Sequence, residues 1–592
     1  MYRAPVDEIA FTLKHVARMN EAIGQGSLGD LSEDLVDAIL EEAGKFASDE
    51  VAPLHKIGDE HGAVLKDAAV TMPPGWKEVY HHWIEGGWSA LTGPEAYGGQ
   101  DLPVMLSVAA LEMWNSASMA FGIGPTLTLG AVDAIEKHAT EELKQTYLAK
   151  LVSGEWMGTM NLTEPQAGSD LNALRARAEP AGDGTYRIFG QKIFITYGEH
   201  DLADNIVHLV LARLPDAPPG TGGISMFLVP KFIPGADGAR GTRNSVAAVG
   251  IEHKLGLHGS PTCTMAYDGA VGWLVGEEHR GLACMFTMMN LARHAVGVEG
   301  YAIASRAYQQ AVNYTRERVQ GKPLVEGQEY PGGIINHPDI RRLLMTMRSQ
   351  VEAMRMLSLN CAVAFDIAKA NADETIREQS RRRGELLTPL VKGWSTETGV
   401  ELCSMSVQAH GGMGYIEETE VAQTLRDSRI TPIYEGTTAI QANDLVGRKT
   451  LRDQGLGMRE LLGDMRATQE ALEQSSNSLL ANTLAGAFGR AIDDLQTVVD
   501  WLLEEKNPVL QYAGSVNYLM MSGRIAGGWM LMQAALAANE ALEAGQGDAA
   551  FYSAKLALAE FYAWHILPLA SAMLPAIVDG GRATVSLADS QF

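Results

Sequence analysis

The chain has 592 residues, and 46% of them are hydrophobic, a content typical of folded globular proteins and too high for a disordered chain. Its 72 acidic and 47 basic residues give a formal charge of −25. That field repels nucleic acids and anionic membranes, so the composition argues against both as partners.

Cysteine usage and the two chain ends indicate the compartment. The four cysteines are Cys263, Cys284, Cys361 and Cys403. They form no CxxC pair, which argues against a metal site or a disulfide framework and suits a reducing cytoplasm. The first twenty residues carry charges throughout and lack the apolar core of a signal peptide. We therefore expect a cytoplasmic protein without a bound metal.

The longest apolar run lies at 562–578. It is short for a membrane span, and it contains His565, Pro568 and Pro575. We expect a buried helix here, and no membrane span in the chain.

Hydrophobic periodicity changes twice along the chain, near residues 156 and 280, and we expect four parts. Residues 1–155 are a leader followed by helices, and 156–280 are a β domain. Residues 281–450 are helical again, and 451–592 are an additional helical domain. In the β domain, short β-branched and aromatic runs predict strands at 187–196, 205–213, 224–230 and 263–267. Their lengths suit a small barrel or sandwich.

After residue 450, apolar residues recur at helical spacing and predict three or more amphipathic helices. The apolar positions are Leu461, Leu462, Met465, Leu472, Leu495, Val498, Val499, Leu502, Ile525, Trp529 and Met532. Gly527 and Gly528 precede Trp529 and would allow two helices to approach closely. No catalytic constellation is visible in this part, so we expect it to pack on the helices before it, on an interface, or on both.

Residues 162–170, LTEPQAGSD, read as a turn ahead of the strand at 187–196. Such a turn presents backbone N–H groups and hydroxyls, which can stabilise negative charge on a planar ring. An ordinary strand-end turn explains the same residues.

The stretch 408–441 holds two glycine-rich turns with an amphipathic helix between them. Pro432 ends that helix, so Glu435 lies on a turn beside Gly436, Thr437 and Thr438. A carboxylate held this way is a candidate general base if its surroundings raise its pKa. A plain surface glutamate is the alternative.

Taken together, these motifs resemble the acyl-CoA dehydrogenase flavoproteins. QAHGGMGY, RD and IYEGT resemble the C-terminal signature of that family, TEPQAGSD its TEPxAGSD loop, and KIFITYG its KxWITNG strand. The resemblance covers about residues 75–450. It implies a mostly α fold with a central β domain: an N-terminal helical domain, a middle β-barrel and a C-terminal four-helix bundle, followed here by the extra C-terminal helical domain.

The resemblance also implies FAD as the cofactor. Leu162, Thr163 and Gly168 would line the flavin, Phe194 would stack on it, and Thr196 would bond near its hydride-accepting nitrogen. The residues expected at the FAD of a partner subunit are Arg318, Gln408, Gly412 and Thr437. Arg318 is expected to contact the FAD pyrophosphate. A different alignment of the motif would give this role to Arg316. These contacts require a homodimer or a higher homo-oligomer.

For the substrate, the resemblance makes Glu435 the base that takes the α-proton of an acyl-CoA thioester while the β-hydride passes to the flavin, giving a trans-2-enoyl-CoA. Its backbone N–H is expected to donate to the thioester oxygen. Ser169, Arg293 and Gly436 are the other expected substrate contacts. An electron-transfer flavoprotein would then reoxidise the FAD.

The full-length pattern most resembles the subgroup that oxidises 3-(methylthio)propionyl-CoA to methylthioacryloyl-CoA in dimethylsulfoniopropionate catabolism. A dehydrogenase for short or medium straight-chain acyl-CoA is the alternative. An acyl-CoA oxidase, a DNA-binding relative and a non-catalytic FAD-binding scaffold are the other readings. The acidic C-terminal part counts against DNA binding, and Glu435 counts against the scaffold.

Three positions depart from the family pattern. Phe194 replaces the usual tryptophan and lacks its indole N–H. The arginine motif that ends at Gly321 is shorter than in the family and lacks its phenylalanine. Ala439 stands where a glutamine is common.

Overall fold

The computed structural model describes residues 2–235, 238–322, 324–325, 327 and 331–592. The chain divides into two compact units. Unit 1 contains residues 1–44, 104–116 and 296–592, and unit 2 contains residues 45–103 and 117–295. Helices α6 (Val104–His138) and α8 (Gly281–Glu317) contribute residues to both units, and α6 is interrupted at Ser118, whose backbone is not helical.

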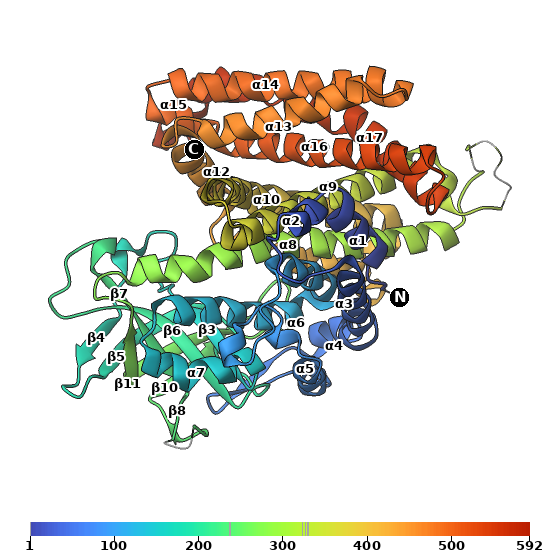
Figure 1. Ribbon diagram of the computed structural model, residues 1–592. Coiled ribbons are helices and arrows are strands. Elements are labelled where there is room, and N and C mark those ends of the chain that lie inside the picture. The colour runs from blue at the N-terminus through green and yellow to red at the C-terminus, as the bar shows by residue number, and fades with distance from the viewer. Residues whose placement is uncertain (1, 236–237, 323, 326, 328–330) are drawn as a thin grey trace. The chain divides into compact units, whose positions relative to one another are not determined.

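The centre of unit 2 is a seven-stranded sheet (Figure 1). Its strands are β3 (Trp156–Asn161), β4 (Arg177–Pro180), β5 (Tyr186–Thr196), β6 (Asn205–Arg213), β7 (Ile224–Pro230), β10 (Val246–Ile251) and β11 (Thr262–Val275). Strands β11, β5, β4, β6 and β7 pair in a closed ring, with β4 and β6 joined by the single parallel pair Arg177–Arg213. The sheet is therefore the expected small barrel, with β3 and β10 attached to it.

Three of the predicted strands are confirmed to within one residue at each end, as β5, β6 and β7. The fourth prediction was too short, because β11 continues eight residues beyond Tyr267 to Val275. Gly269, at φ +74°, lies in a shift of register between Asp268 and Ala270. A glycine bulge of this kind lets the strand continue past residues that read as a turn.

The remaining elements of unit 2 are short. Its hairpins are β1 (Val64–Lys66) with β2 (Ala69–Thr71), and β8 (Phe232–Ile233) with β9 (Thr242–Arg243). Its helices, besides its parts of α6 and α8, are α4 (Leu54–His61), α5 (Trp76–Glu85) and α7 (Glu141–Ser153). Thr140 caps α7 by accepting from the N–H of Leu143, and Gly154 ends it in a left-handed conformation.

Unit 1 is built on long helices (Figure 1). They are the second part of α8, α9 (Pro338–Ala370) and α10 (Glu374–His410), with α11 (Val421–Ser428) and α12 (Thr438–Val446) after them. Asp373 caps α10 by accepting from two backbone N–H groups, and Gly411 at φ +59° ends it. The N-terminal helices α1 (Val6–His15), α2 (Met19–Gly24) and α3 (Glu33–Phe46) begin the chain.

The additional C-terminal domain is helical, as predicted, and all eleven apolar positions singled out in the sequence are buried. Its elements are α13 (Leu456–Glu473), α14 (Ala485–Glu504), α15 (Pro508–Ala513), α16 (Ser515–Glu543), α17 (Ala549–His565), α18 (Leu567–Ser571), α19 (Leu574–Val578) and α20 (Gly581–Thr584).

Helix α16 of this domain packs directly on α10 of the bundle. A Cβ atom at Gly523 or Gly527 would come within 2.4 Å of the Trp394 ring system or its Cβ. These two glycines therefore allow the close approach of α16 and α10. The expectation that this part packs on the preceding helices is confirmed.

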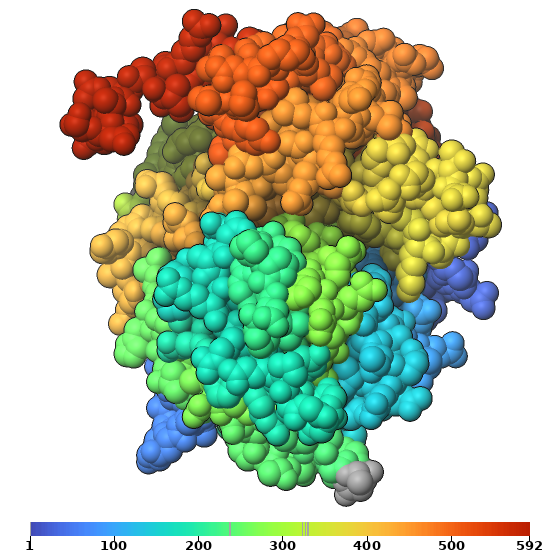
Figure 2. Space-filling model, turned by 90° about the vertical axis from the view of Figure 1, so that its left-hand side faces the viewer, coloured from blue at the N-terminus to red at the C-terminus, as the bar shows by residue number. Residues whose placement is uncertain are grey.

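The apolar run 562–578 is not the single buried helix that we expected. It ends α17 and forms α18 and α19, because Pro568 and Pro575 each stand at the start of a new helix. Trp564 and Leu569 are 56% and 52% exposed. From Arg582 onward the side chains are exposed, and Figure 2 shows the end of the chain as a red projection.

Among the residues that the structure describes, two helical stretches are long and apolar enough to cross a membrane, Val104–His138 and Ala549–Val578. In the most apolar 18-residue window of the first stretch, 83% is buried within the protein, as in a core helix. In the second stretch the corresponding share is 33%. The absence of a membrane span stays a prediction.

A buried ion pair joins α6 to α9 within unit 1. The guanidinium of Arg355 donates to the carboxylate of Glu112 at 2.6–3.0 Å, and both side chains are at most 3% exposed. We expect Glu112→Gln to lower the free energy of unfolding by about 3–5 kcal/mol in urea titration, because it leaves a buried cation without its partner. The control is Asp339→Asn, which breaks an exposed pair with Arg342 on the same helix and should cost about 1 kcal/mol or less. Equal losses in the two variants would contradict the importance of the buried pair.

Candidate active site

The loop 162–170 of unit 2 is anchored by the carboxylate of Glu164, which is 4% exposed. It accepts from the ammonium of Lys192 on β5 at 2.8 Å, and from the backbone N–H groups of Arg175 and Ala176 at 2.8 and 2.9 Å. Burial by itself raises the pKa of Glu164, but Lys192 and these N–H groups outweigh it and lower the pKa below its ordinary value. The loop is therefore fixed from inside the protein.

Lys192 also ties the loop to the strand, because its ammonium donates to the carbonyl of Leu162 at 3.0 Å. The side chain is fully buried. Our reading of the sequence assigned no role to Glu164 or Lys192. Their place in the family motifs could have indicated a role, because Glu164 belongs to TEPQAGSD and Lys192 begins KIFITYG.

Phe194 lies next to this loop on a bulge of β5. Two residues of β5, Ile193 and Phe194, stand opposite Thr264 of β11, and Phe194 has φ +59°. Bulges re-aim side chains, and here the ring points out of the barrel and is 59% exposed. The N–H of Ile193 donates to the carbonyl of Thr163 at 2.9 Å, so the loop and the bulge lie side by side.

The structure thus brings together the predicted residues of the middle part of the chain. Leu162, Thr163 and Thr196 are half-buried around the bulge, while Gly168 and Ser169 are exposed on the loop. A Cβ atom at Gly168 would meet no atom within 4 Å. An exposed aromatic face beside threonine hydroxyls and open backbone fits a flat, hydrogen-bonding ring such as a flavin.

Arg293 lies on α8, also in unit 2, and is 8% exposed. Its guanidinium is 5.9 Å from the centre of the Phe286 ring, within reach of a cation–π interaction. Its substrate contact stays a prediction.

In unit 1, Glu435 lies on a turn between α11 and α12. Helix α11 ends at Ser428, four residues before Pro432, so the proline lies inside the turn and does not itself end the helix. Glu435 has φ +53° and Gly436 has φ +89°, two consecutive residues in the left-handed region. A non-glycine residue held in this region stores backbone strain, which is common at functional sites.

The turn is closed onto the start of α12. The N–H of Thr438 donates to the carbonyl of Pro432 at 3.1 Å. The side-chain amide of Gln441 lies 3.4 and 3.3 Å from the carbonyls of Glu435 and Gly436. Thr437 caps the helix by accepting from the N–H of Ile440 at 3.3 Å. Thr437 therefore has a structural task, which the sequence did not indicate.

A second glutamate, Glu299 on α8, stands beside this turn and is 3% exposed. Its carboxyl accepts a hydrogen bond from the hydroxyl of Tyr434, the residue directly before Glu435. Sequence reasoning missed Glu299, because a single glutamate in a long helix gives no signal of burial.

The glycine turn after α10 holds two more predicted residues. Gln408 is exposed in the last turn of α10, and Gly412 is exposed in a 3₁₀ segment, Gly411–Tyr415. Arg318 follows the end of α8, where its N–H donates to Tyr314 and its carbonyl accepts from Ile334. Arg316 and Arg318 are both exposed, so the choice between them stays open.

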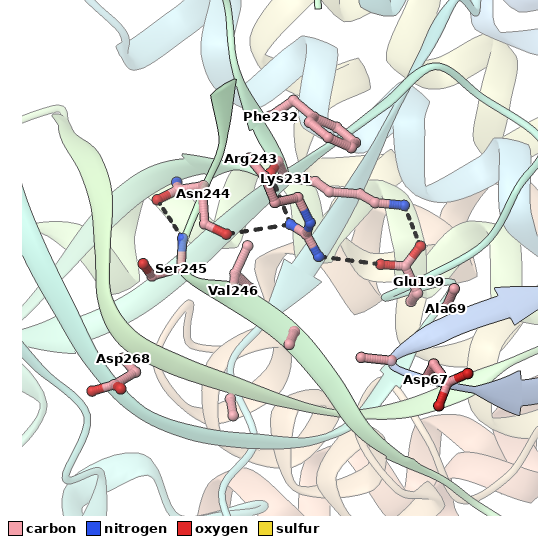
Figure 3. A pocket seen from close by; sticks show the side chains of 13 residues that line it. Asp67, Ala69, Glu199, Lys231, Phe232, Arg243, Asn244, Ser245, Val246 and Asp268 are labelled. Carbon is pink, nitrogen blue, oxygen red and sulfur yellow. Dashed lines mark hydrogen bonds and ion pairs between the residues drawn. The ribbon is translucent and has the colours of Figure 1, made fainter. Parts of the chain in front are cut away.

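A cavity of about 660 Å³ lies elsewhere in unit 2, between β8, β9, β10 and the β1–β2 hairpin (Figure 3). Lys231 and Arg243 pair there with the buried Glu199. Two cations and three carboxylates line it, with Asp67 and Asp268 as the other two acids, so its formal charge does not favour an anion. None of the predicted site residues lines this cavity. No group of ligating side chains able to hold a metal occurs among the residues that the structure describes.

Comparison with known families agrees with the motifs. The family model "Acyl-CoA dehydrogenase, N-terminal domain" matches residues 34–155, the middle-domain model 159–270 and the C-terminal-domain model 279–450. A fourth model, "Acetyl-CoA dehydrogenase C-terminal like", matches 461–588. The boundaries 155/156, 280/281 and 450/451 nevertheless remain our own prediction.

Curated relatives match over nearly the whole chain. The chain is 47% identical to 3-methylmercaptopropionyl-CoA dehydrogenase of Ruegeria pomeroyi, covering 98% of each. It is 35% identical to the broad-specificity linear acyl-CoA dehydrogenase FadE5 of Mycobacterium tuberculosis, covering 96% of each. It is also 35% identical to a butyryl-CoA dehydrogenase of Syntrophomonas wolfei, covering 95% of this chain and 94% of the relative.

Solved structures show the same fold. ACDH-11 of Caenorhabditis elegans, in complex with C11-CoA, has a TM-score of 0.75 at 20% identity and covers 90% of this chain and 87% of its own. An acyl-CoA dehydrogenase of Bacillus anthracis complexed with FAD has a TM-score of 0.72 at 22% identity, covering 96% and 91%. The motifs, the fold and these relatives agree: the chain belongs to the acyl-CoA dehydrogenase family, as an FAD-dependent oxidoreductase that dehydrogenates an acyl-CoA.

Proposed function

We propose that the chain oxidises 3-(methylthio)propionyl-CoA to methylthioacryloyl-CoA, with Glu435 as the base. The observation that carries the base assignment is the conformation of Glu435, a carboxylate held on consecutive left-handed residues beside a buried acid. The substrate rests on the 47% identity to the Ruegeria pomeroyi enzyme over 98% of both chains. A short straight-chain acyl-CoA such as butyryl-CoA is the second candidate, since relatives named for it are 34–35% identical.

The chemistry assigned to the protein is proton transfer and orientation. Glu435 removes the α-proton, and its backbone N–H donates to the oxygen that becomes negative as the proton leaves. Ser169, Arg293 and Gly436 orient the thioester. FAD, when bound, supplies the acceptor for the β-hydride.

The cofactor contacts that we propose are the ones that the family resemblance implies, and all of these residues are at least partly exposed. On unit 2, Phe194 stacks on the flavin, Thr163 and Thr196 supply hydroxyls, and Leu162 and Gly168 line the ring. On unit 1, the contacts to the FAD of a partner subunit are Arg318, Gln408, Gly412 and Thr437. This assignment makes the protein a homodimer or a higher homo-oligomer.

Acyl-CoA dehydrogenases pass their electrons to electron-transfer flavoproteins, and we assign the same acceptor here. The four cysteines are free and buried, which supports a reducing cytoplasm. With the proposed substrate, the enzyme would serve dimethylsulfoniopropionate catabolism.

The base assignment is tested by flavin bleaching. The FAD-loaded protein is mixed anaerobically with 3-(methylthio)propionyl-CoA or butyryl-CoA, and the loss of oxidised flavin absorbance is followed. We expect Glu435→Gln to slow bleaching by about 100- to 10,000-fold, because it keeps the size of the side chain but removes the base.

Glu418→Gln is the matched control, since Glu418 is an exposed glutamate of the preceding turn, and it should bleach like the wild type. The faster substrate identifies the acyl chain. Bleaching by Glu435→Gln at the wild-type rate would remove Glu435 as the base.

The loop anchor gives a second test. We expect Lys192→Met to lower the free energy of unfolding by about 3–5 kcal/mol, because Glu164 would be buried without its cation. The protein should also release FAD more readily, as the loop carrying Thr163 loses its tie to β5. Thermal unfolding and the flavin content after gel filtration measure the two effects.

Lys150→Met is the control for this variant, since it removes an exposed pair with Glu155 and should cost about 1 kcal/mol or less. If Lys192→Met retained both the stability and the flavin of the wild type, the loop would not depend on this anchor.

A further inference from the structure

The turn that carries Glu435 is held from two neighbouring helices by two buried, titratable side chains. From α8, the carboxyl of Glu299 accepts the Tyr434 hydrogen bond. From α10, the ammonium of Lys392 donates to the carbonyl of Thr431 at 2.9 Å, and Lys392 is fully buried. Both contacts fall within four residues of Glu435, so they hold the segment of the turn from which its side chain projects.

Three titratable groups act on Glu299: Lys392 from α10, and Tyr434 and Glu435 from the turn. Burial is the largest influence and raises the pKa of Glu299 to about 8. The Tyr434 hydrogen bond and the charge of Lys392 lower this pKa, whereas the charge of Glu435 raises it. At neutral pH the Glu299 carboxyl therefore keeps its proton for most of the time.

Electrostatic coupling between two acids is reciprocal. Because the negative charge of Glu435 makes Glu299 hold its proton more tightly, a negative charge on Glu299 makes Glu435 bind a proton more tightly by the same free energy. Ionised Glu299 thus makes Glu435 a stronger base, and neutral Glu299 makes it a weaker one.

We propose that Glu299 is the positioning residue of the base: through Tyr434 it fixes the turn, and by gaining or losing its own proton it tunes the proton affinity of Glu435. The inference rests on the proposed role of Glu435 as the base. Glu299 itself neither touches the substrate nor takes its proton. The α-proton goes to Glu435, while the proton on Glu299 exchanges with solvent as the pH changes.

The variant Glu299→Gln separates the two roles of Glu299, holding the turn through Tyr434 and changing its own charge. Glutamine keeps an oxygen that accepts the Tyr434 hydrogen bond, but it cannot ionise near pH 8. The rate of anaerobic flavin reduction by saturating 3-(methylthio)propionyl-CoA is measured between pH 6 and 10 in the full-length, FAD-loaded protein, beside the wild type and Glu435→Gln.

In the wild type we expect a rise in rate through an ionisation near pH 8. In Glu299→Gln this ionisation should be absent, and at pH 9 the rate should be about 3- to 10-fold below the wild type. A pH profile of Glu299→Gln that superimposes on the wild-type profile would overturn the proposal. Reduction by Glu435→Gln at the wild-type rate would instead overturn the base assignment, so the two failures are distinguishable.

A readout without substrate checks the same group. Between the ordinary pKa of a glutamate, near 4.5, and about 8, the folded protein holds a proton that the unfolded chain has lost. Stability must therefore fall as the pH rises through this window. We expect the melting temperature of Glu299→Gln to fall less between pH 5 and 8 than that of the wild type, and an equal fall would contradict the raised proton affinity of Glu299.

Two further variants complete the test. Tyr434→Phe removes the hydroxyl that links Glu299 to the turn, and it should lower the reduction rate with little further loss when combined with Glu299→Gln. Fully additive losses would show that Glu299 does not act through Tyr434. Asp366→Asn is the matched control, because burial also raises the pKa of Asp366, to about 7, while its partners are the N–H groups of Val104 and Met105. Its pH profile of flavin reduction should follow the wild type.

Discussion

The short turn between α11 and α12 is the constraint on which the candidate site depends. Its closure onto the start of α12 forces Glu435 and Gly436 into the left-handed region. For a residue with a side chain, this conformation costs about 1–2 kcal/mol. It persists because Gln441 and the Thr437 cap hold the backbone on one side, and Tyr434 and Thr431 are bound from α8 and α10 on the other. A strained backbone held by several contacts fixes the direction in which the Glu435 side chain leaves the turn.

Buried carboxylates perform different tasks in the two units because their partners differ. Glu164 has a lysine and two backbone N–H groups within 3 Å, so it stays ionised and anchors a loop. Glu299 accepts a neutral hydroxyl and is affected by a lysine whose ammonium is bound to a carbonyl, so burial outweighs its partners and it keeps a proton. The same side chain is thus a fixed structural charge in one place and a titratable group in the other.

The C-terminal domain supports the bundle at the level of the turn that carries Glu435. Gly393 and Trp394 of α10, the two residues after Lys392, pack against Leu519, Gly523 and Gly527 of α16. Lys392 itself is fully buried, and a charge interacts more strongly with its neighbours in such surroundings than in water. The added domain therefore has a physical connection to the site, although it carries none of the predicted catalytic residues.

The sequence by itself determined the family, the order of helical and β parts, three strands to within a residue, and the motifs that hold Glu435, Thr163 and Phe194, because these depend on local pattern and spacing. The tertiary structure alone decided the rest. The bulge that exposes Phe194 needs Thr264 of β11 opposite it, and β11 continues past Tyr267 because Gly269 permits a register shift. The tertiary structure also decided that the run 562–578 forms several helices that are partly exposed. Glu299 meets Tyr434 across 135 residues of chain, and such a contact has no local signal. Burial and charge coupling are properties of neighbours in space, so they appear only once the chain has folded.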